Sequence, residues 1–191
     1  MAFLRRADYS KQIRSEILSV VTSDDDSIRK DAELAATAEI ESYLRHRYDM
    51  AKVFLDLPTY DAATAYTTKD LIAFPDNEDD IFSVNADVDG NPQTITGVSP
   101  VDDPTKWTQG DTRNALIKMH LVDMTLYHLH SRINPRNIPE FRISRRDDCI
   151  EWLRMVAKGS ITTSLPILEP ESDKIGLKIK WDSNLKFNHN Y

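Results

Sequence analysis

The most constraining feature of this sequence is a middle segment that differs in character from the regions on either side of it. Up to about Pro58, and again from Thr112, apolar residues recur at the three- and four-residue spacing of amphipathic helices. Residues 59–111 lose this spacing and are rich in Asp, Asn, Thr, Pro and Gly, which favour turns and short strands. This order predicts a helical body that is interrupted by a small β-module.

The charges follow the same division. Residues 59–111 contain 11 acidic and 2 basic residues, a net charge of −9, whereas residues 112–166 contain 5 acidic and 9 basic residues, a net charge of +4. Acidity confined to one segment favours a separate unit. No basic stripe is interleaved with aromatic residues, which argues against a nucleic-acid-binding face.

Four helices are expected in the flanking regions. The first runs from Ser10, its N-cap, to about Thr22, and the second from about Ser27 to Tyr48. The third runs from Thr112 or Arg113 to about Arg132, with Asp111 or Thr112 as its cap. The fourth runs from about Ser144 to Lys158, and Gly159 ends it. The expected apolar faces include Ile17 in the first helix and Leu116 and Met119 in the third. The third helix is apolar around so much of its circumference that we expect it to be central.

The segment 59–111 contains β-type runs separated by turns. Leu71–Phe74 and Ile81–Val84 are predicted to pair as a hairpin through the loop at 75–80, and a second turn is expected at residues 89–92. A module of this size needs a large side chain at its centre, and Trp107 is the expected one. The predicted fold is therefore mainly α: a four-helix bundle formed by residues 1–58 and 112–166, an inserted β-module at 59–111, and an extended C-terminal arm at 167–191.

The C-terminal arm has a pattern of its own. Apolar side chains alternate with polar ones between residues 174 and 181, and the apolar set comprises Ile175, Leu177, Ile179 and Trp181. This alternation is typical of a strand, yet the arm has no local segment with which to pair. An unpaired strand at a chain end is suited to joining a neighbouring protein. We therefore expect the arm to contact another subunit or partner.

Two helical segments resemble the phage neck-protein family typified by Mu-like prophage head–tail adaptor proteins. Residues 36–48 (ATAEIESYLRHRY) are similar to the alanine-rich helix of that family, which ends in an Ile-x-x-Tyr-Leu-x-x-Arg-Tyr pattern. Residues 149–161 (CIEWLRMVAKGSI) are similar to its closing helix, in which Trp-Leu precedes an Ala-x-Gly stop. The β-module and the long arm depart from the family pattern.

This resemblance implies an adaptor-type bundle acting as a structural virion protein. Such a head-to-tail connector subunit would form a ring, expected to be a dodecamer, beneath the portal protein and extend the DNA channel toward downstream tail or neck proteins. The resemblance brings no catalytic residues and no cofactor, so no enzymatic activity is expected. Packaged DNA would only pass through the channel during genome ejection. The N-terminus has no apolar stretch suited to a secretion signal, so assembly is expected in the host bacterial cytoplasm, with the virion neck as the final location.

The β-module has a second resemblance, to chitin-binding-type modules. It rests on residues 65–74 (AYTTKDLIAF), residues 81–84 (IFSV), residues 97–100 (GVSP) and Trp107, with Lys69 in place of a usual glycine. Sugar stacking would depend on Tyr60, Tyr66 and Trp107. The alternative function is thus a surface binding module in which this insert recognises a glycan.

The remaining candidates are charged or metal-binding side chains. Arg142, Arg145 and Arg146 lie in a basic stretch that is a candidate for contact with an acidic portal or neighbouring subunit, and intrachain ion pairing is an equal alternative. His120 and Asp123 share one face of the third helix, but the spacing of His128 and His130 is poor for a shared metal, and no metal site is expected. Cys149 lies in a helical pattern and is expected in the core.

Overall fold

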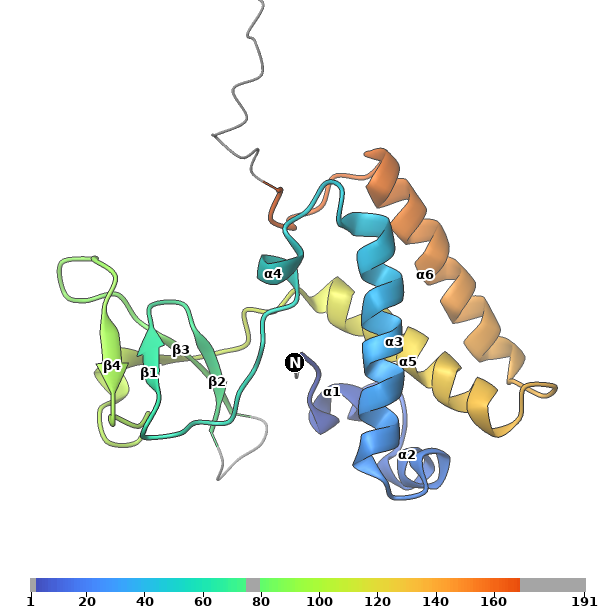
Figure 1. Ribbon diagram of the computed structural model, residues 1–191, viewed down its shortest axis with the longest axis horizontal. Coiled ribbons are helices and arrows are strands. Elements are labelled where there is room, and N and C mark those ends of the chain that lie inside the picture. Colours follow the sequence, from blue (N-terminus) through green and yellow to red (C-terminus); the bar gives the residue numbers. More distant parts are fainter. Residues whose placement is uncertain (1–2, 75–79, 169–191) are drawn as a thin grey trace, which may run out of the picture.

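The computed structural model describes residues 3–74 and 80–168, and this part of the chain combines helices with small antiparallel sheets. The prediction of a mainly α-helical chain is therefore confirmed only in part. Figure 1 shows the strands grouped to one side of the helices. The described helices are α1 (Arg6–Ser10), α2 (Ser15–Thr22), α3 (Asp26–Leu44), α4 (Met50–Val53), α5 (Ala115–Ile133) and α6 (Glu140–Lys158).

Helix α5 is the centre of the helical body. It packs against α1, α2, α3 and α6, and α3 also contacts α6. Its buried residues fall on several sides of the helix, from Ile117 through Leu121 and Met124 to Leu129. The expectation of a central third helix is confirmed.

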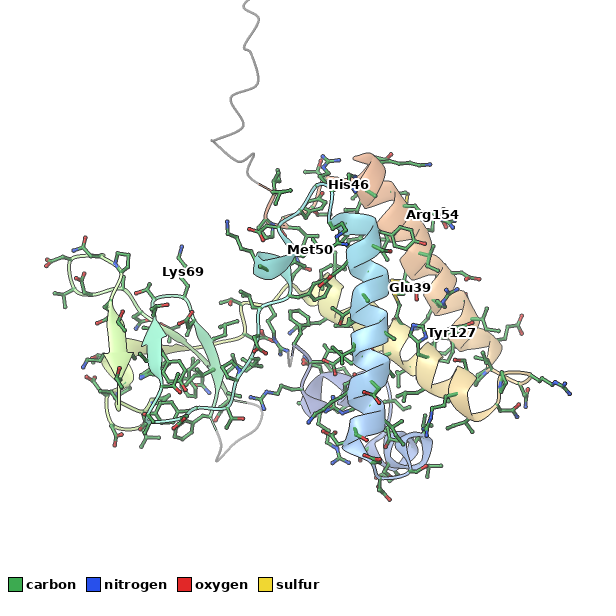
Figure 2. The ribbon with its side chains drawn as sticks, viewed as in Figure 1. Glu39, His46, Met50, Lys69, Tyr127 and Arg154 are labelled. Atoms are coloured by element: carbon green, nitrogen blue, oxygen red, sulfur yellow. The ribbon has the colours of Figure 1, made fainter. Side chains whose placement is uncertain are left out.

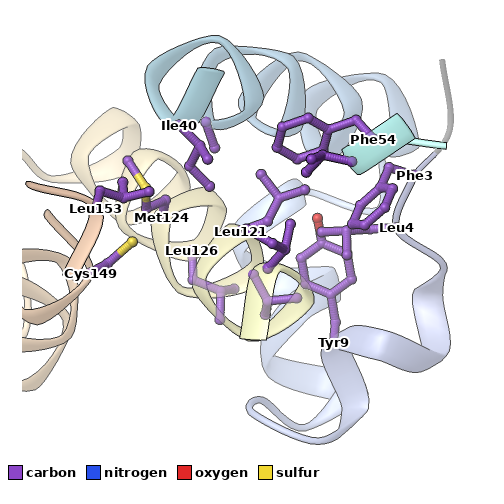
Figure 3. Packing of buried hydrophobic residues seen from close by; sticks show 14 of the residues in the cluster. Phe3, Leu4, Tyr9, Ile40, Phe54, Leu121, Met124, Leu126, Cys149 and Leu153 are labelled. Carbon is purple, nitrogen blue, oxygen red and sulfur yellow. The ribbon is translucent and has the colours of Figure 1, made fainter. Parts of the chain in front are cut away.

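The core of this body includes a segment that periodicity did not identify. Phe3, Leu4 and Tyr9 are buried and contribute to the same cluster as Ile40 and Leu121 (Figure 3). The rings of Phe3 and Phe54 meet edge to face, with 5.3 Å between their centroids. The N-terminal residues therefore close one end of the helical core.

The first predicted helix is wrong in its boundaries. Ser10 is the last residue of α1 rather than an N-cap, and a turn separates α1 from α2. Because of this break, Ile13 and Ile17 do not lie on one face of a continuous helix, and Ile13 is buried whereas Ile17 is 48% exposed. Leu18 and Val21, which the helical spacing also placed on the apolar face, are buried on α2 as predicted.

Other helix ends also differ from the prediction. Helix α5 begins at Ala115, since the Asn114 side chain accepts hydrogen bonds from the backbone N–H groups of Leu116 and Ile117. Helix α3 ends at Leu44, and α6 begins earlier than predicted, at Glu140. Gly159 ends α6 in the left-handed conformation with φ of 77°, as predicted.

The β-module contains a two-stranded and a three-stranded antiparallel sheet. The first pairs β1 (Ala65–Thr67) with β4 (Thr94–Thr96), and the second has the order β2 (Leu71–Ala73), β3 (Ile81–Val84), β5 (Trp107–Gln109), preceded by a short 3-10 helix at Pro104–Lys106. The predicted β2–β3 hairpin is confirmed by the Ile72–Phe82 pairing, although loop residues 75–79 lie outside the described part of the chain.

Trp107 is 4% exposed and forms the centre of this module, as predicted. It packs with Tyr66, Ile72, Val84 and Ile95. A separate cluster of Leu57, Leu71, Ala73 and Ile81 lies near the chain that enters the module. The module thus has an apolar centre distinct from that of the helices.

The last described residues are tied to the segment between α3 and α4. Pro166 accepts a hydrogen bond from the backbone N–H of Asp49 (2.9 Å), and Leu168 donates one to the carbonyl of Arg47 (3.0 Å). Ile167 forms an antiparallel bridge with Tyr48. The predicted arm residues Ile175, Leu177, Ile179 and Trp181 lie outside the described residues.

Candidate functional site

A buried ionic cluster joins the N-terminal segment to the start of α5. Arg113, 5% exposed, donates to Asp111 through Nε (2.9 Å) and to Asp8 through Nη1 (2.9 Å). It also donates to the carbonyl of Phe3, and Lys118 donates to Asp111. Two regions that are distant in sequence, residues 3–8 and 111–113, therefore meet at one guanidinium group. The fork geometry of arginine suits such multiple contacts.

This cluster predicts a pH dependence of stability. Burial raises the pKa of Asp111, but hydrogen bonds from Arg113 and Lys118 outweigh it and lower the pKa from 3.8 to about 2. Because the folded-state pKa is depressed, the stabilisation is complete above about pH 4 and is lost as the pH falls through about 2. The side chain is 25% exposed, so we expect a contribution of about 1–2 kcal/mol after allowance for solvent screening.

Urea unfolding between pH 6 and pH 2 checks this prediction. The free energy of unfolding should fall more steeply for the unaltered protein than for Asp111→Asn across the acidic part of the range, because the amide does not titrate. Parallel pH profiles for the two proteins would contradict it.

A second buried cluster links α1 to α3. Glu33 accepts hydrogen bonds from the backbone N–H of Leu4 (3.0 Å), the Tyr9 hydroxyl (3.3 Å) and Arg29 (3.1 Å). Burial raises the pKa of Glu33. The cluster satisfies polar groups under the N-terminal segment and is structural in character.

The three predicted interface arginines all make contacts within the chain. Arg142 and Arg145 both approach the buried carboxylate of Asp123, at 3.5 and 3.2 Å. Arg146 pairs with Glu39 (2.9 Å) and lies 4.7 Å from the ring centroid of Tyr127. Glu39 and Tyr127 are labelled in Figure 2. Arg142 is 7% exposed, whereas Arg145 keeps 38% of its side chain exposed. The interface role of these arginines stays a prediction.

One surface groove, here called groove B, lies between α1, α5 and α6. It has a volume of about 430 Å³ and contains the exposed apolar side chains of Met119 (40%) and Phe141 (57%). Its remaining lining residues are Asp8, Lys11, Gln12, Ala115, Lys118, Val122 and Arg145. Groove B is therefore an apolar surface with a mainly basic border. The periodicity predicted Met119 as a core residue; it is exposed because it faces this groove, while Leu116 is 49% exposed.

A second groove, here called groove A, lies along α3. It has a volume of about 400 Å³, and Phe3, Leu4 and Phe54 form its buried apolar base. Leu34 is 56% exposed and forms part of the wall. The other lining residues are Arg29, Lys30, Glu33, Thr37, Ala38 and Glu41. Groove A shares no lining residue with groove B.

A third surface, here called the α2 patch, combines exposed apolar and acidic residues. Ile17 (48%) and Val20 (74%) are exposed on α2. Glu16 and Asp24 are also exposed and give the patch a negative charge. Its composition is thus complementary to that of groove B, apolar at both surfaces and opposite in charge.

The residues considered for metal binding are occupied by other contacts. The ring of His120 stacks on Trp152 at 4.6 Å, and burial lowers the pKa of His120. His128 lies 3.2 Å from Glu39. Within residues 3–74 and 80–168, no group of three or more His, Cys, Asp or Glu side chains could hold a metal ion.

Cys149 is fully buried in the core, as predicted. Burial raises the pKa of its thiol to about 12. Such a thiol has almost no reactive thiolate at neutral pH.

The aromatic residues considered for sugar stacking face the interior of the β-module. Tyr66 and Trp107 are each 4% exposed, and the Trp107 indole N–H donates to the carbonyl of Val98 (3.2 Å). Tyr60 stacks on Tyr66 with 5.8 Å between centroids. These rings form a core, so no observation favours the glycan-binding alternative.

No family model, curated protein or solved structure matches this chain. None of the described helices combines the length and the hydrophobicity that a membrane span requires. The sequence pattern indicated Arg145 but neither groove, because each groove is lined by residues that are distant in sequence.

Proposed function

We propose that this protein is a structural, non-enzymatic subunit: a phage head-to-tail connector that forms a ring beneath the portal protein and extends the DNA channel toward the tail. The proposal combines the resemblance of residues 36–48 and 149–161 to neck-protein helices with the surfaces described above. The observation that carries it is the complementarity between groove B and the α2 patch.

A cyclic ring is held by one heterologous contact that repeats around the axis. Each subunit must therefore present two different surfaces that fit one another. Groove B offers Phe141 and Met119 with basic neighbours, and the α2 patch offers Ile17 and Val20 with acidic neighbours. Burial of the apolar groups would supply affinity, and the opposite charges would set the orientation.

The portal is the expected template for this ring. The charges of groove B are partly neutralised within the subunit, because Lys118 donates to Asp111 and Arg145 pairs with Asp123. Each single contact is therefore expected to be weak, and assembly would depend on several subunits binding to one symmetric partner.

Native mass spectrometry of the purified protein, alone and mixed with its portal, tests the proposal. The expected result is a 21.9 kDa monomer alone and a high-order complex of fixed stoichiometry with the portal. A monomer that remains unchanged in the presence of portal rings would refute the connector function. An unrelated portal of the same symmetry is the control for non-specific binding.

A further inference from the structure

Groove A has the properties of a binding site for an apolar chain segment. Its base is the buried pair Phe3 and Phe54 together with Leu4, and Leu34 leaves more than half of its side chain exposed beside them. An occupant that covers Leu34 would remove apolar surface from water at a preformed site.

The chain itself leaves the helical body close to this groove. Leu168 donates to the carbonyl of Arg47, Asp49 donates to Pro166, and Ile167 and Tyr48 pair in an antiparallel manner. This pairing directs residues 166–168 from Asp49, the N-cap of α4, back toward the C-terminal end of α3. Phe54 directly follows α4 and lines groove A. His46 and Met50, labelled in Figure 2, are the residues directly before and after Arg47, Tyr48 and Asp49, which bind residues 166–168.

The distance from this exit to the groove is short compared with the chain that follows. The sequence continues for 23 residues after Leu168. The seven residues from Leu168 to Ile175 can span up to about 23 Å when extended. Along α3, the ten residues from Leu44 back to Leu34 correspond to about 15 Å. The apolar part of the arm can therefore reach groove A within one molecule.

The chemistry of the arm fits the groove. In an extended conformation, Ile175, Leu177 and Ile179 would lie on one side of the arm, and Lys178 and Lys180 on the other. A segment that belongs to the same chain and lies within reach of the groove has an effective concentration on the order of 1 mM, which favours it over a free competitor.

We infer that groove A is the docking site for residues 174–181 of the same subunit. The docked arm covers Leu34 and the Phe3–Phe54 pair, and its release leaves the arm available to another protein. This inference does not depend on the proposed ring, since it concerns the isolated subunit.

Cysteine crosslinking in the full-length protein tests the inference. Thr37→Cys places a thiol in groove A, and Lys178→Cys places one in the arm while leaving the apolar residues unchanged. The control pairs Ala35→Cys with Lys178→Cys, because residues 35 and 37 are rotated by about 200° from one another on the helix. Cys149 can stay, since its thiol is buried and its pKa is raised to about 12.

A short bis-maleimide reagent is expected to link Thr37→Cys to Lys178→Cys within monomers. At about 10 µM protein the intramolecular product should exceed crosslinked dimers by about a hundredfold. Adding Leu177→Asp should reduce its rate to that of the Ala35→Cys control. Equal rates for the Thr37→Cys and Ala35→Cys pairs would overturn the inference. Predominant crosslinked dimers would also overturn it and would identify a second copy as the occupant.

Discussion

Replacing Phe141 with aspartate is expected to abolish assembly of the ring on the portal while the subunit stays folded. Phe141 is 57% exposed, so its loss removes little apolar contact from the monomer. Its ring lies 4.7 Å from the guanidinium of Arg145, and the new carboxylate could pair with that group. In the assembled ring the same carboxylate would face the acidic α2 patch. Loss of an aromatic anchor at an interface centre costs about 2 kcal/mol or more, and the loss repeats at each contact.

Native mass spectrometry with the portal measures this effect, and circular dichroism checks the fold. Val88→Asp is the matched control, because Val88 is fully exposed in the β-module and lies outside groove B.

A charge exchange provides a stricter test. Lys11→Glu and Glu16→Lys should each weaken assembly, and the double variant should recover part of it. Normal assembly of Phe141→Asp would exclude groove B from the subunit contact.

Replacing Arg113 with methionine is expected to destabilise the protein by about 3 kcal/mol or more. The substitution would leave the buried carboxylate of Asp8 and the partly buried one of Asp111 without their main partner, and removal of one member of a buried ion pair typically costs about 3–5 kcal/mol. Lys118 remains close to both carboxylates and offsets part of the loss, which places the expected value near the lower end.

Urea unfolding at pH 7 measures this effect. Arg136→Met is the control, because Arg136 is exposed in the link between α5 and α6 and its replacement should change the free energy of unfolding by less than about 0.5 kcal/mol. The triple variant Arg113→Met, Asp8→Asn, Asp111→Asn should recover much of the stability, since no carboxylate of the cluster is left without its guanidinium partner. A single variant as stable as the control would show that the cluster is dispensable.

Local patterns predicted those parts of the fold that depend on neighbouring residues. The stripe Ala36, Ile40 and Leu44 is buried along α3, the β2–β3 hairpin pairs as expected, and Gly159 ends α6. In each case the determining signal lies within a few residues: a helical spacing, a strand–loop–strand pattern or a glycine after the last turn.

The parts that were missed depend on contacts between distant residues. Phe3 and Tyr9 enter the core because Glu33 and Arg113 bind the backbone and side chains around them. The pair of Asp8 and Arg113 joins residues separated by 105 positions, which no local pattern reveals. Groove B is lined in part by Lys11 and Gln12, which lie in the turn between α1 and α2, and the continuous helix predicted from Ser10 concealed this turn.

The position of the β-module between α3 and α5 has a consequence for how the chain folds. These two helices are close partners in the core, yet about 70 residues separate Leu44 from Ala115. During synthesis, α3 leaves the ribosome well before its main packing partner has been translated. If the module folds first, its paired strands shorten the loop that must close, and this lowers the entropy cost of bringing α3 to α5. The module can thus act as a folding spacer in addition to any role it has at the surface.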